Sequence, residues 1–323
     1  MPTPRFVNNL SDLHILVYLV GYPEMGESII VIMKDMATGV IHHSCAIDCY
    51  KTTLNKTQQI LSSHGITSLD FLCWTHTDKD HSIGLEDIIK SNCTDKTCFV
   101  LPEGLTGSDD DFVKYDADTL ACFNLINPFN VNSNYRVFSA SASSDGYNFL
   151  QGWEFEDNAG QQFNYNIFAL SPNSSLLRRR VSGGIKKKND LSIALIFKIG
   201  ELSLFMTSDI ENQTLRLINK DLIADVDYLK TPHHTSTSSD YLLEIFEEIN
   251  TSSRKIPFTC STVFKQHDLP DTSLMNNYKK YTDKFFCTGY DQNKADDGVI
   301  KVEYNIATKL SKHEIFGNAE QKF

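Results

Sequence analysis

The stretch WTHTDKDHSIG, residues 74–84, carries four side chains within six positions that could bind a metal ion, namely His76, Asp78, Asp80 and His81. Imidazole and carboxylate groups suit zinc and manganese. Two adjacent pairs, His76 with Asp78 and Asp80 with His81, could hold two ions a few ångströms apart. A hydroxide held between two such ions attacks phosphorus or an acyl carbon at neutral pH, and both charges stabilise the oxyanion that forms.

A solvated polar loop with helix-capping aspartates is the alternative for this stretch. It suits one histidine and one aspartate better than four ligand-type residues placed so close together. Further residues of these types follow later in the chain, since Asp209 ends one predicted strand and His233 and His234 end another. Asp209 could instead cap the next helix, but its position at a strand end favours a role as a metal ligand. For the histidine pair, either residue could be the ligand, with a slight preference for His233.

The elements around these residues are expected to place them at strand ends, where a rigid strand presents a loop that can curl round an ion. The apolar run 69–75 predicts a short strand leading into the first motif, and 85–90 predicts the helix after it. Residues 191–209 predict a hairpin that turns at Gly200, and 224–232 predicts a further strand. The other predicted elements are strands at 27–35, 42–50, 257–263, 284–290 and 298–306, and helices at 53–65, 210–220 and 238–250.

The motif THTDKDHSIG resembles the signature of the metallo-β-lactamase fold superfamily, a strand that ends in His-x-His-x-Asp-His-x-x-Gly. Asp78 stands where that signature has its second histidine. This departure is similar to one branch, the metallo-β-lactamase-like domain of the bacterial competence DNA-uptake channel and its stand-alone relatives, which carry His-Pro-Asp-x-Asp-His. The resemblance implies an α/β fold, a four-layer αββα sandwich with the site at one edge of the sheets.

Later segments extend the resemblance from about Glu27 to Val302, with a gap across 102–166. NDLSIALIFKIGELSLFMTSDIE is similar to the paired-strand segment of that branch, and Asp209 falls on its metal-bridging aspartate. DYLKTPHHTSTSS resembles Leu-Lys-x-x-His-His-Gly-Ser, which places His233 or His234 on the last ligand. FKQHDLPDTSLMNNY and FFCTGYDQNKADDGVIKV resemble its closing segment. Asp48 matches the early buried aspartate that braces the metal loop.

The sequence also departs from the family pattern. Ser208 and Thr235 replace glycines, and no histidine lies between His81 and His233, so the third histidine ligand of classical members is absent. The named branch also tends to lack it. An ion held by His76, Asp78 and Asp209 has an oxygen-rich site, for which manganese or magnesium is as suitable as zinc.

The resemblance implies two divalent metal ions, zinc or manganese with magnesium possible. The expected metal ligands are His76, Asp78, Asp80, His81, Asp209 and His233. The expected catalytic residues are Asp80, which would also orient the bridging hydroxide, together with His233 and His234.

A basic segment, LLRRRVSGGIKKKND, precedes the predicted hairpin and stands out in a chain of net charge −11. Its cations would attract a polyanion if the segment folds over the mouth of the site. A solvated loop is the alternative. The expected substrate-binding residues are Arg178, Arg179, Arg180, Lys186, Lys187 and Lys188, with His267 as a further pocket residue.

The length of 323 residues suits a single domain over 1–323. This domain would contain an insertion at about 102–166, which we expect to form short strands and loops. No apolar run approaches the length that spans a bilayer, and the first residues show no signal peptide. Eight scattered cysteines favour reduced thiols and a cytoplasmic location.

These observations predict a metal-dependent hydrolase of phosphodiester bonds, and within that class a nuclease acting on DNA. One alternative is a hydrolase of a small phosphorylated, cyclic-nucleotide, ester or amide substrate. The other is a catalytically weak member of the fold that serves as a partner in a larger complex, such as a defence system, or as a homo-oligomer.

Overall fold

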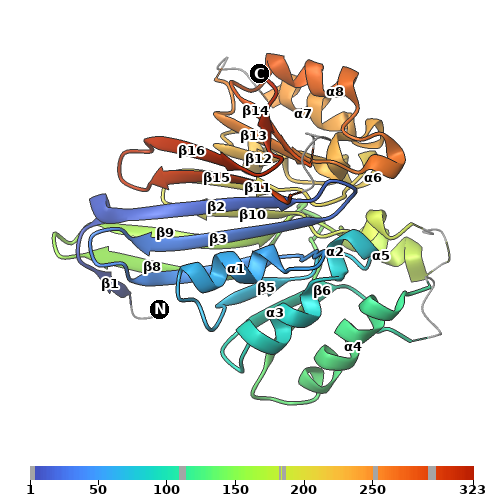
Figure 1. Ribbon diagram of the computed structural model, residues 1–323, viewed down its shortest axis with the longest axis horizontal. Helices are drawn as coiled ribbons and strands as arrows, with labels where there is room; N and C mark the ends of the chain where they lie inside the picture. Colours follow the sequence, from blue (N-terminus) through green and yellow to red (C-terminus); the bar gives the residue numbers. More distant parts are fainter. Residues whose placement is uncertain (1–3, 109–113, 182, 184–186, 250–253, 290–295) are drawn as a thin grey trace.

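Two β-sheets packed face to face form the centre of the molecule, and helices cover the outer face of each sheet (Figure 1). This computed structural model describes residues 4–108, 114–181, 183, 187–249, 254–289 and 296–323. The four layers confirm the αββα sandwich expected from the resemblance to the metallo-β-lactamase fold. Among the described residues, no helix combines the length and apolar character needed to cross a membrane.

The first sheet, in spatial order, consists of β1 (Arg5–Val7), β8 (Asn148–Asp157), β9 (Gln162–Ala169), β10 (Leu195–Ile199), β11 (Leu202–Met206), β12 (Tyr228–Lys230), β13 (Phe258–Thr262), β14 (Phe285–Thr288) and β17 (Glu320–Gln321). The second sheet consists of β16 (Ser311–Phe316), β15 (Gly298–Asn305), β2 (Leu13–Gly21), β3 (Glu27–Asp35), β4 (Ile41–Ile47), β5 (Phe71–Cys73), β6 (Cys98–Pro102) and β7 (Arg136–Ala140). Both sheets draw strands from both halves of the chain, because β15 pairs with β2.

The central core lies between the two sheets and contains side chains such as Val17 and Val31 from one sheet and Phe197 and Leu204 from the other. Helices α1 (Lys56–Ser63), α3 (Leu85–Asn92) and α4 (Ala117–Asn130) pack on the outer face of the second sheet. Helices α6 (Asn212–Leu215), α7 (Tyr241–Ile249) and α8 (Thr272–Asn277) pack on the outer face of the first. Burial of apolar surface between the two sheets, and between each sheet and its helices, is the main force that holds the sheets in place.

Strand direction determines where the functional side chains meet. Strands β4 to β7 are parallel to one another, and so are β11 to β14. The carboxyl ends of parallel neighbours lie at the same edge of a sheet, which is where ligands bind in α/β folds. The loops after β4, β5, β11, β12 and β13 therefore converge.

Most elements near the site agree with the sequence prediction. Strands β10 and β11 form the expected antiparallel hairpin, which turns at Gly200 with a φ of 56°. The expected helix at 210–220 is shorter, since α6 covers only Asn212–Leu215. The strand predicted to end at Tyr50 stops at Ile47, which leaves Asp48 in a loop.

The prediction of short strands and loops for 102–166 is wrong. This segment contains the 14-residue helix α4 and the 10-residue strand β8. Its strand β7 joins one sheet, whereas β8 and β9 join the other. The helix was hidden because apolar residues (Leu120, Ala121 and Leu125) lie between its buried positions, Thr119, Cys122, Phe123 and Ile126, so no polar face marks the repeat, and because Pro128 lies inside it.

Candidate metal centre

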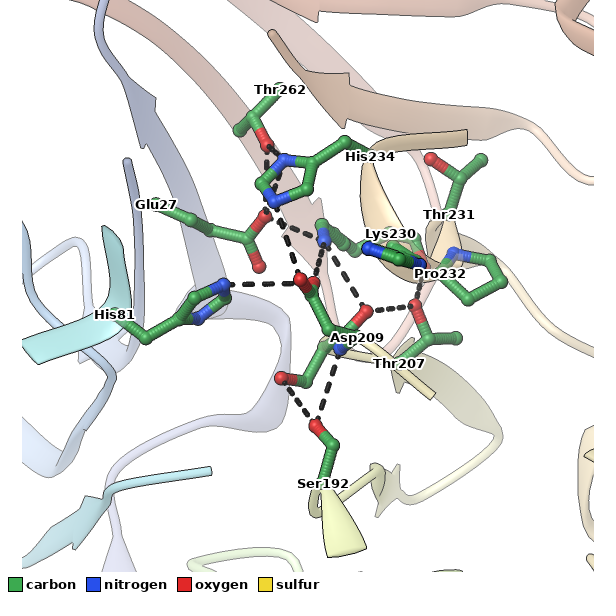
Figure 2. Close-up of polar contacts among 12 residues, drawn as sticks. Glu27, His81, Ser192, Thr207, Asp209, Lys230, Thr231, Pro232, His234 and Thr262 are labelled. Atoms are coloured by element: carbon green, nitrogen blue, oxygen red, sulfur yellow. Dashed lines mark hydrogen bonds and ion pairs between the residues drawn. The ribbon is translucent and has the colours of Figure 1, made fainter. Parts of the chain in front are cut away.

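Residues from three segments far apart in the sequence meet at the carboxyl ends of β5, β11 and β12. His76 follows β5, and Asp80 and His81 lie on the short helix α2 (Lys79–Ser82). Asp209 follows β11, and His234 follows β12. Figure 2 shows Asp209 between His81 and His234, with Lys230 behind it.

Four of these side chains form a compact group whose ligand-type atoms all lie within 4.8 Å of one another. His81 Nε2 lies 3.4 Å from Asp80 Oδ2 and 3.5 Å from Asp209 Oδ1. His234 Nε2 lies 3.2 Å from Asp80 Oδ2 and 3.4 Å from Asp209 Oδ2. Two imidazoles and two carboxylates arranged in this way match the donor set and number of a tetrahedral metal site.

Most of these ligand-type atoms are buried without a hydrogen-bond partner among the described residues. This holds for Nε2 of His76, His81 and His234, for Asp80 Oδ2 and for Asp209 Oδ1. Buried polar atoms in proteins are nearly always satisfied, because leaving one unpaired costs about 1–3 kcal/mol. A divalent cation would satisfy several of them at once, so the buried cluster of His and Asp fits a metal centre.

A second, looser arrangement adjoins the first and shares Asp209. His76 Nε2 lies 3.5 Å from Asp78 Oδ2 and 3.9 Å from Asp209 Oδ2. The side chain of Asp78 is a third exposed, and its other oxygen, Oδ1, lies 2.5 Å from Lys188 Nζ. With Asp209 common to both arrangements, the cluster fits a dinuclear site.

Asp48 braces the loop that carries His76 and His81, as the resemblance of the sequence motifs led us to expect. It has a left-handed φ of 53° and is 1% exposed. Its Oδ2 accepts hydrogen bonds from His81 Nδ1 at 2.7 Å and Thr75 Oγ1 at 2.5 Å, while Oδ1 accepts from the backbone N–H of Thr75 at 2.7 Å. Because these contacts already use its oxygens, Asp48 orients the ligands instead of joining them.

A left-handed turn directs His234 into the cluster. Three consecutive residues have positive φ, with values of 46° at His233, 53° at His234 and 63° at Thr235. Ser208, before Asp209, also has a positive φ of 47°. Non-glycine residues rarely adopt this conformation, and they concentrate at functional sites. Ser208 and Thr235 are the positions at which the family has glycine.

His233 lies at the rim and not in the cluster. Its Nδ1 lies 2.8 Å from Ser238 Oγ and 3.4 Å from Glu211 Oε1, and its Nε2 lies 3.3 Å from Asn189 Nδ2. The slight preference of the sequence analysis for His233 as a metal ligand therefore disagrees with the geometry, which brings His234 to the other ligand atoms.

A cleft of about 440 Å³ opens over the cluster. The residues that line it include Asp78, Asp80, Asp209, His233 and His234. Its walls contain Met25, Lys79, Asn189, Phe264, Gln266 and His267. The rings of Phe264 and His267 stack with centroids 4.9 Å apart, so the predicted pocket residue His267 does face the cleft.

The basic segment approaches the same cleft at its C-terminal end. Lys188 Nζ contacts Asp78 and donates to Thr77 O at 3.3 Å, and Lys187 pairs with Glu211 at 2.9 Å. Further along the chain, α5 (Ser174–Val181) presents Arg178 and Arg179 on the surface, while Arg180 donates to Gly104 O. Lys186 lies outside the described residues.

The close carboxylates and imidazoles alter one another's protonation. Burial lowers the pKa of His234, but the carboxylates of Asp209 and Asp80 outweigh it and raise the pKa to about 9. The pKa of His81 is likewise raised, because Asp80, Asp209 and Asp48 overcome its burial. Burial raises the pKa of Asp80 and of Asp209, yet their imidazole neighbours hold both pKa values below the usual range. Without metal, protons on the imidazoles balance the carboxylates.

Two charged residues beside the cluster were given no role by the sequence analysis. Glu27 and Lys230 are fully buried, and Lys230 Nζ lies 2.5 Å from Glu27 Oε2. Lys230 is the one charged residue in the short strand β12 and comes just before the turn that carries His233 and His234. That placement was a signal available in the sequence.

No family model matches the chain, and no curated protein matches it. Among solved structures, it is similar to a new diphosphatase from the PhnP family, with 14% identity over 81% of this chain and 91% of that chain and a TM-score of 0.37. It is also similar to a mutant of the CmlA β-hydroxylase, with 10% identity over 81% of this chain and 36% of that chain and a TM-score of 0.34. TM-scores this low support no transfer of activity.

The raised pKa of His234 predicts that the metal-free protein loses stability as pH rises. Between its ordinary pKa of 6.5 and about 9, the folded state holds a proton that the unfolded state releases. The free energy of unfolding should therefore be highest below pH 6.5 and fall by on the order of 3 kcal/mol towards pH 9. Urea denaturation of chelator-treated protein at several pH values measures this change. A His234→Gln variant should show a smaller slope, and a constant or rising stability in the wild type would contradict the prediction.

Proposed function

We propose that the protein is a metal-dependent hydrolase of phosphoester bonds, and within that class a phosphodiesterase that acts on DNA. The observation that supports this most is the set of buried ligand atoms that face one another without hydrogen-bond partners. The closer relationship to the competence-channel branch also remains a proposal, which rests on the sequence motifs.

One ion would be held by Asp80, His81, Asp209 and His234, and the other by His76, Asp78 and Asp209. This assignment replaces His233 with His234 because only the Nε2 of His234 lies near Asp80 and Asp209. When bound, two divalent cations such as zinc, manganese or magnesium supply the Lewis acidity that activates water and neutralises charge on a phosphoryl oxygen.

Residues of the chain would orient the water, hold the ions and transfer the proton. Asp80, which lines the cleft, accepts a hydrogen bond from the attacking water and so orients it. Asp209 would serve both positions, because its Oδ1 lies 3.5 Å from His81 Nε2 of the first set and its Oδ2 lies 3.9 Å from His76 Nε2 of the second. His233, half-buried at the rim, exchanges a proton with the leaving group. Its contacts with Ser238 and Asn189 fix the orientation of the ring.

The substrate is proposed to carry phosphate because cations border the cleft. Lys188 reaches Asp78 from the basic segment and can contact a phosphate that enters beside it. Arg178 and Arg179 lie outside the cleft on α5, where they could hold phosphates of a strand that extends beyond the reacting bond. His267 and Phe264 offer a stacking surface for a base.

The size of the cleft favours the main alternative. A volume of about 440 Å³ accommodates one small phosphorylated molecule, such as a cyclic nucleotide, and lies within the usual range of small-molecule pockets. The other proposals from the sequence, an ester or amide substrate, a partner role in a larger complex, a homo-oligomer and a cytoplasmic location, have no specific support in the described structure.

The proposed activity predicts metal-dependent hydrolysis of phosphodiesters. Chelator-treated protein reloaded with manganese, zinc or magnesium should cleave bis(p-nitrophenyl) phosphate and single- or double-stranded DNA. Asp209→Ala and His234→Gln should lower kcat by roughly 100-fold or more, because each removes a ligand. His233→Gln should lower it less, by roughly tenfold, since the site stays assembled. Metal content by mass spectrometry should fall only in the first two variants.

His64→Gln is the matched histidine control because His64 bonds to Tyr18, outside the cleft. It should retain wild-type activity. Absence of hydrolysis with every metal, for diesters, monoesters and nucleic acids alike, would refute the proposal. Equal activity of Asp209→Ala and the wild type would mean that a contaminant carries it.

Lys188 predicts a separate effect on substrate binding. Lys188→Gln should raise KM for a phosphodiester about tenfold, the usual effect of losing one hydrogen bond to a charged group. The kcat should change much less because the metal ligands stay in place. Lys90→Gln is the control, since Lys90 pairs with Glu86 on the surface of α3. An unchanged KM would exclude Lys188 from substrate binding.

The two surface arginines separate DNA from a small substrate. Binding of an Arg178→Gln/Arg179→Gln variant to DNA should be weaker for all sequences. The slope of log affinity against log salt should fall by roughly one for each arginine. Fluorescence anisotropy with a labelled oligonucleotide measures both quantities. Unchanged DNA affinity and salt slope would favour the small-substrate alternative.

A further inference from the structure

The two ligand histidines of the compact group are supported in different ways. A metal-binding imidazole normally donates its second ring N–H to a carboxylate or a carbonyl, which fixes its tautomer. His81 does so directly, with Nδ1 2.7 Å from Asp48 Oδ2. His234 has no carboxylate in that position. Instead, its Nδ1 lies 2.6 Å from the hydroxyl oxygen of Thr262, at the end of β13.

Thr262 connects His234 to a buried carboxylate. Its hydroxyl donates to Glu27 Oε2 at 2.9 Å, whereas His234 Nδ1 itself is 4.0 Å from that oxygen. Glu27 is 1% exposed and lies at the start of β3, in the other sheet. Figure 2 shows Thr262 and Glu27 beside His234.

Lys230 completes the group by pairing with Glu27. It is 0% exposed, its Nζ lies 2.5 Å from Glu27 Oε2 and 3.8 Å from Asp209 Oδ1, and it donates to Ser208 O at 3.4 Å. Removing such a pair from water is unfavourable, and replacement by apolar residues often stabilises a fold. A buried ion pair beside the metal ligands is therefore poorly explained by packing alone.

The hydrogen bonds that link His234, Thr262 and Glu27 can have only one set of directions. The carboxylate of Glu27, paired with Lys230, accepts only. The Thr262 hydroxyl must then give its hydrogen to Glu27, which leaves its lone pairs to accept from His234 Nδ1–H. With the proton on Nδ1, the lone pair of Nε2 faces Asp80 and Asp209.

We propose that Glu27, Thr262 and Lys230 are positioning residues that hold His234 in its metal-binding tautomer. Glu27 acts on the imidazole through the Thr262 hydroxyl, and Lys230 balances the buried charge of Glu27 behind Asp209. This inference rests on the proposed function, because it takes His234 to be a metal ligand.

The test uses Thr262→Val, which removes the hydroxyl and nearly preserves the shape. Zinc and manganese affinities, measured by chelator competition on the full chain, should fall about 10–100-fold. Thr262→Ser should restore most of the affinity. Thr259→Val is the matched control, because Thr259 is a buried threonine on the same strand whose hydroxyl has no hydrogen-bond partner among the described residues. Its metal affinity should equal that of the wild type.

A spectroscopic readout separates positioning from general loss of structure. In the zinc-loaded wild type, long-range ¹H–¹⁵N spectra should show His234 protonated at Nδ1 and not at Nε2. Thr262→Val should lose or shift that signal, while the Nδ1–H signal of His81 stays in place. If Thr262→Val binds metal as tightly as the wild type and retains the His234 signal, the proposed positioning of His234 through Thr262 is wrong, although the proposed metal site is supported. If the wild type binds no metal, both proposals fail.

Variants of the Glu27–Lys230 ion pair test the proposal independently. Lys230→Met leaves the Glu27 carboxylate buried without a partner and should destabilise the fold strongly. The Glu27→Gln/Lys230→Met double variant removes both charges and should regain the melting temperature. It should not regain metal affinity, because a glutamine amide can donate as well as accept and no longer specifies the tautomer. Wild-type metal affinity in the double variant would overturn the proposal.

Discussion

The structure depends on the exclusion of water from a place where carboxylates and imidazoles meet. Asp80, Asp209, His81 and His234 are each at most 5% exposed, and Asp80 Oδ2, Asp209 Oδ1 and both imidazole Nε2 atoms have no hydrogen-bond partner in the part of the chain that the structure describes. Such a group persists only if something balances its charge and the surrounding fold prevents its relaxation. In the metal-free protein, protons on the imidazoles balance the charge. The two sheets, the left-handed turn and the hydrogen bonds of Asp48 prevent relaxation.

The sandwich was predicted from the resemblance to the metallo-β-lactamase fold. Hydrophobic patterning was enough to predict the strands before the candidate site residues, because they are short apolar runs followed by polar turns. It was not enough where burial is shared with neighbours far along the chain. Strand β2, almost entirely buried between β3 and β15, was not assigned, although nine residues from Leu13 to Gly21 are largely apolar. Helix α4 and strand β8 were missed for other reasons, since apolar residues between the buried positions of α4 hide its repeat and polar residues interrupt the pattern of β8.

For the site, residue type and spacing selected Asp80, His81 and Asp209, which the structure brings together, but could not choose between two adjacent histidines. That choice depends on backbone dihedral angles: the left-handed turn brings His234 to the cluster and leaves His233 at the rim. The pairing of Glu27 with Lys230 was also inaccessible, because it requires knowing that the start of β3 lies beside the end of β12, in the other sheet. Lys188 was predicted to bind substrate because of its charge, and the structure places it beside Asp78.

The ligand set is divided between the two halves of the sandwich. His76, Asp80 and His81 extend from the sheet that contains β5, whereas Asp209 and His234 extend from the sheet that contains β11 and β12. An ion bound by both sets would act as a cross-link between layers that are otherwise joined mainly by apolar contact. Separation of the sheets would then require release of the ion. Metal concentration would thereby govern how often the interior opens to solvent exchange and to proteases.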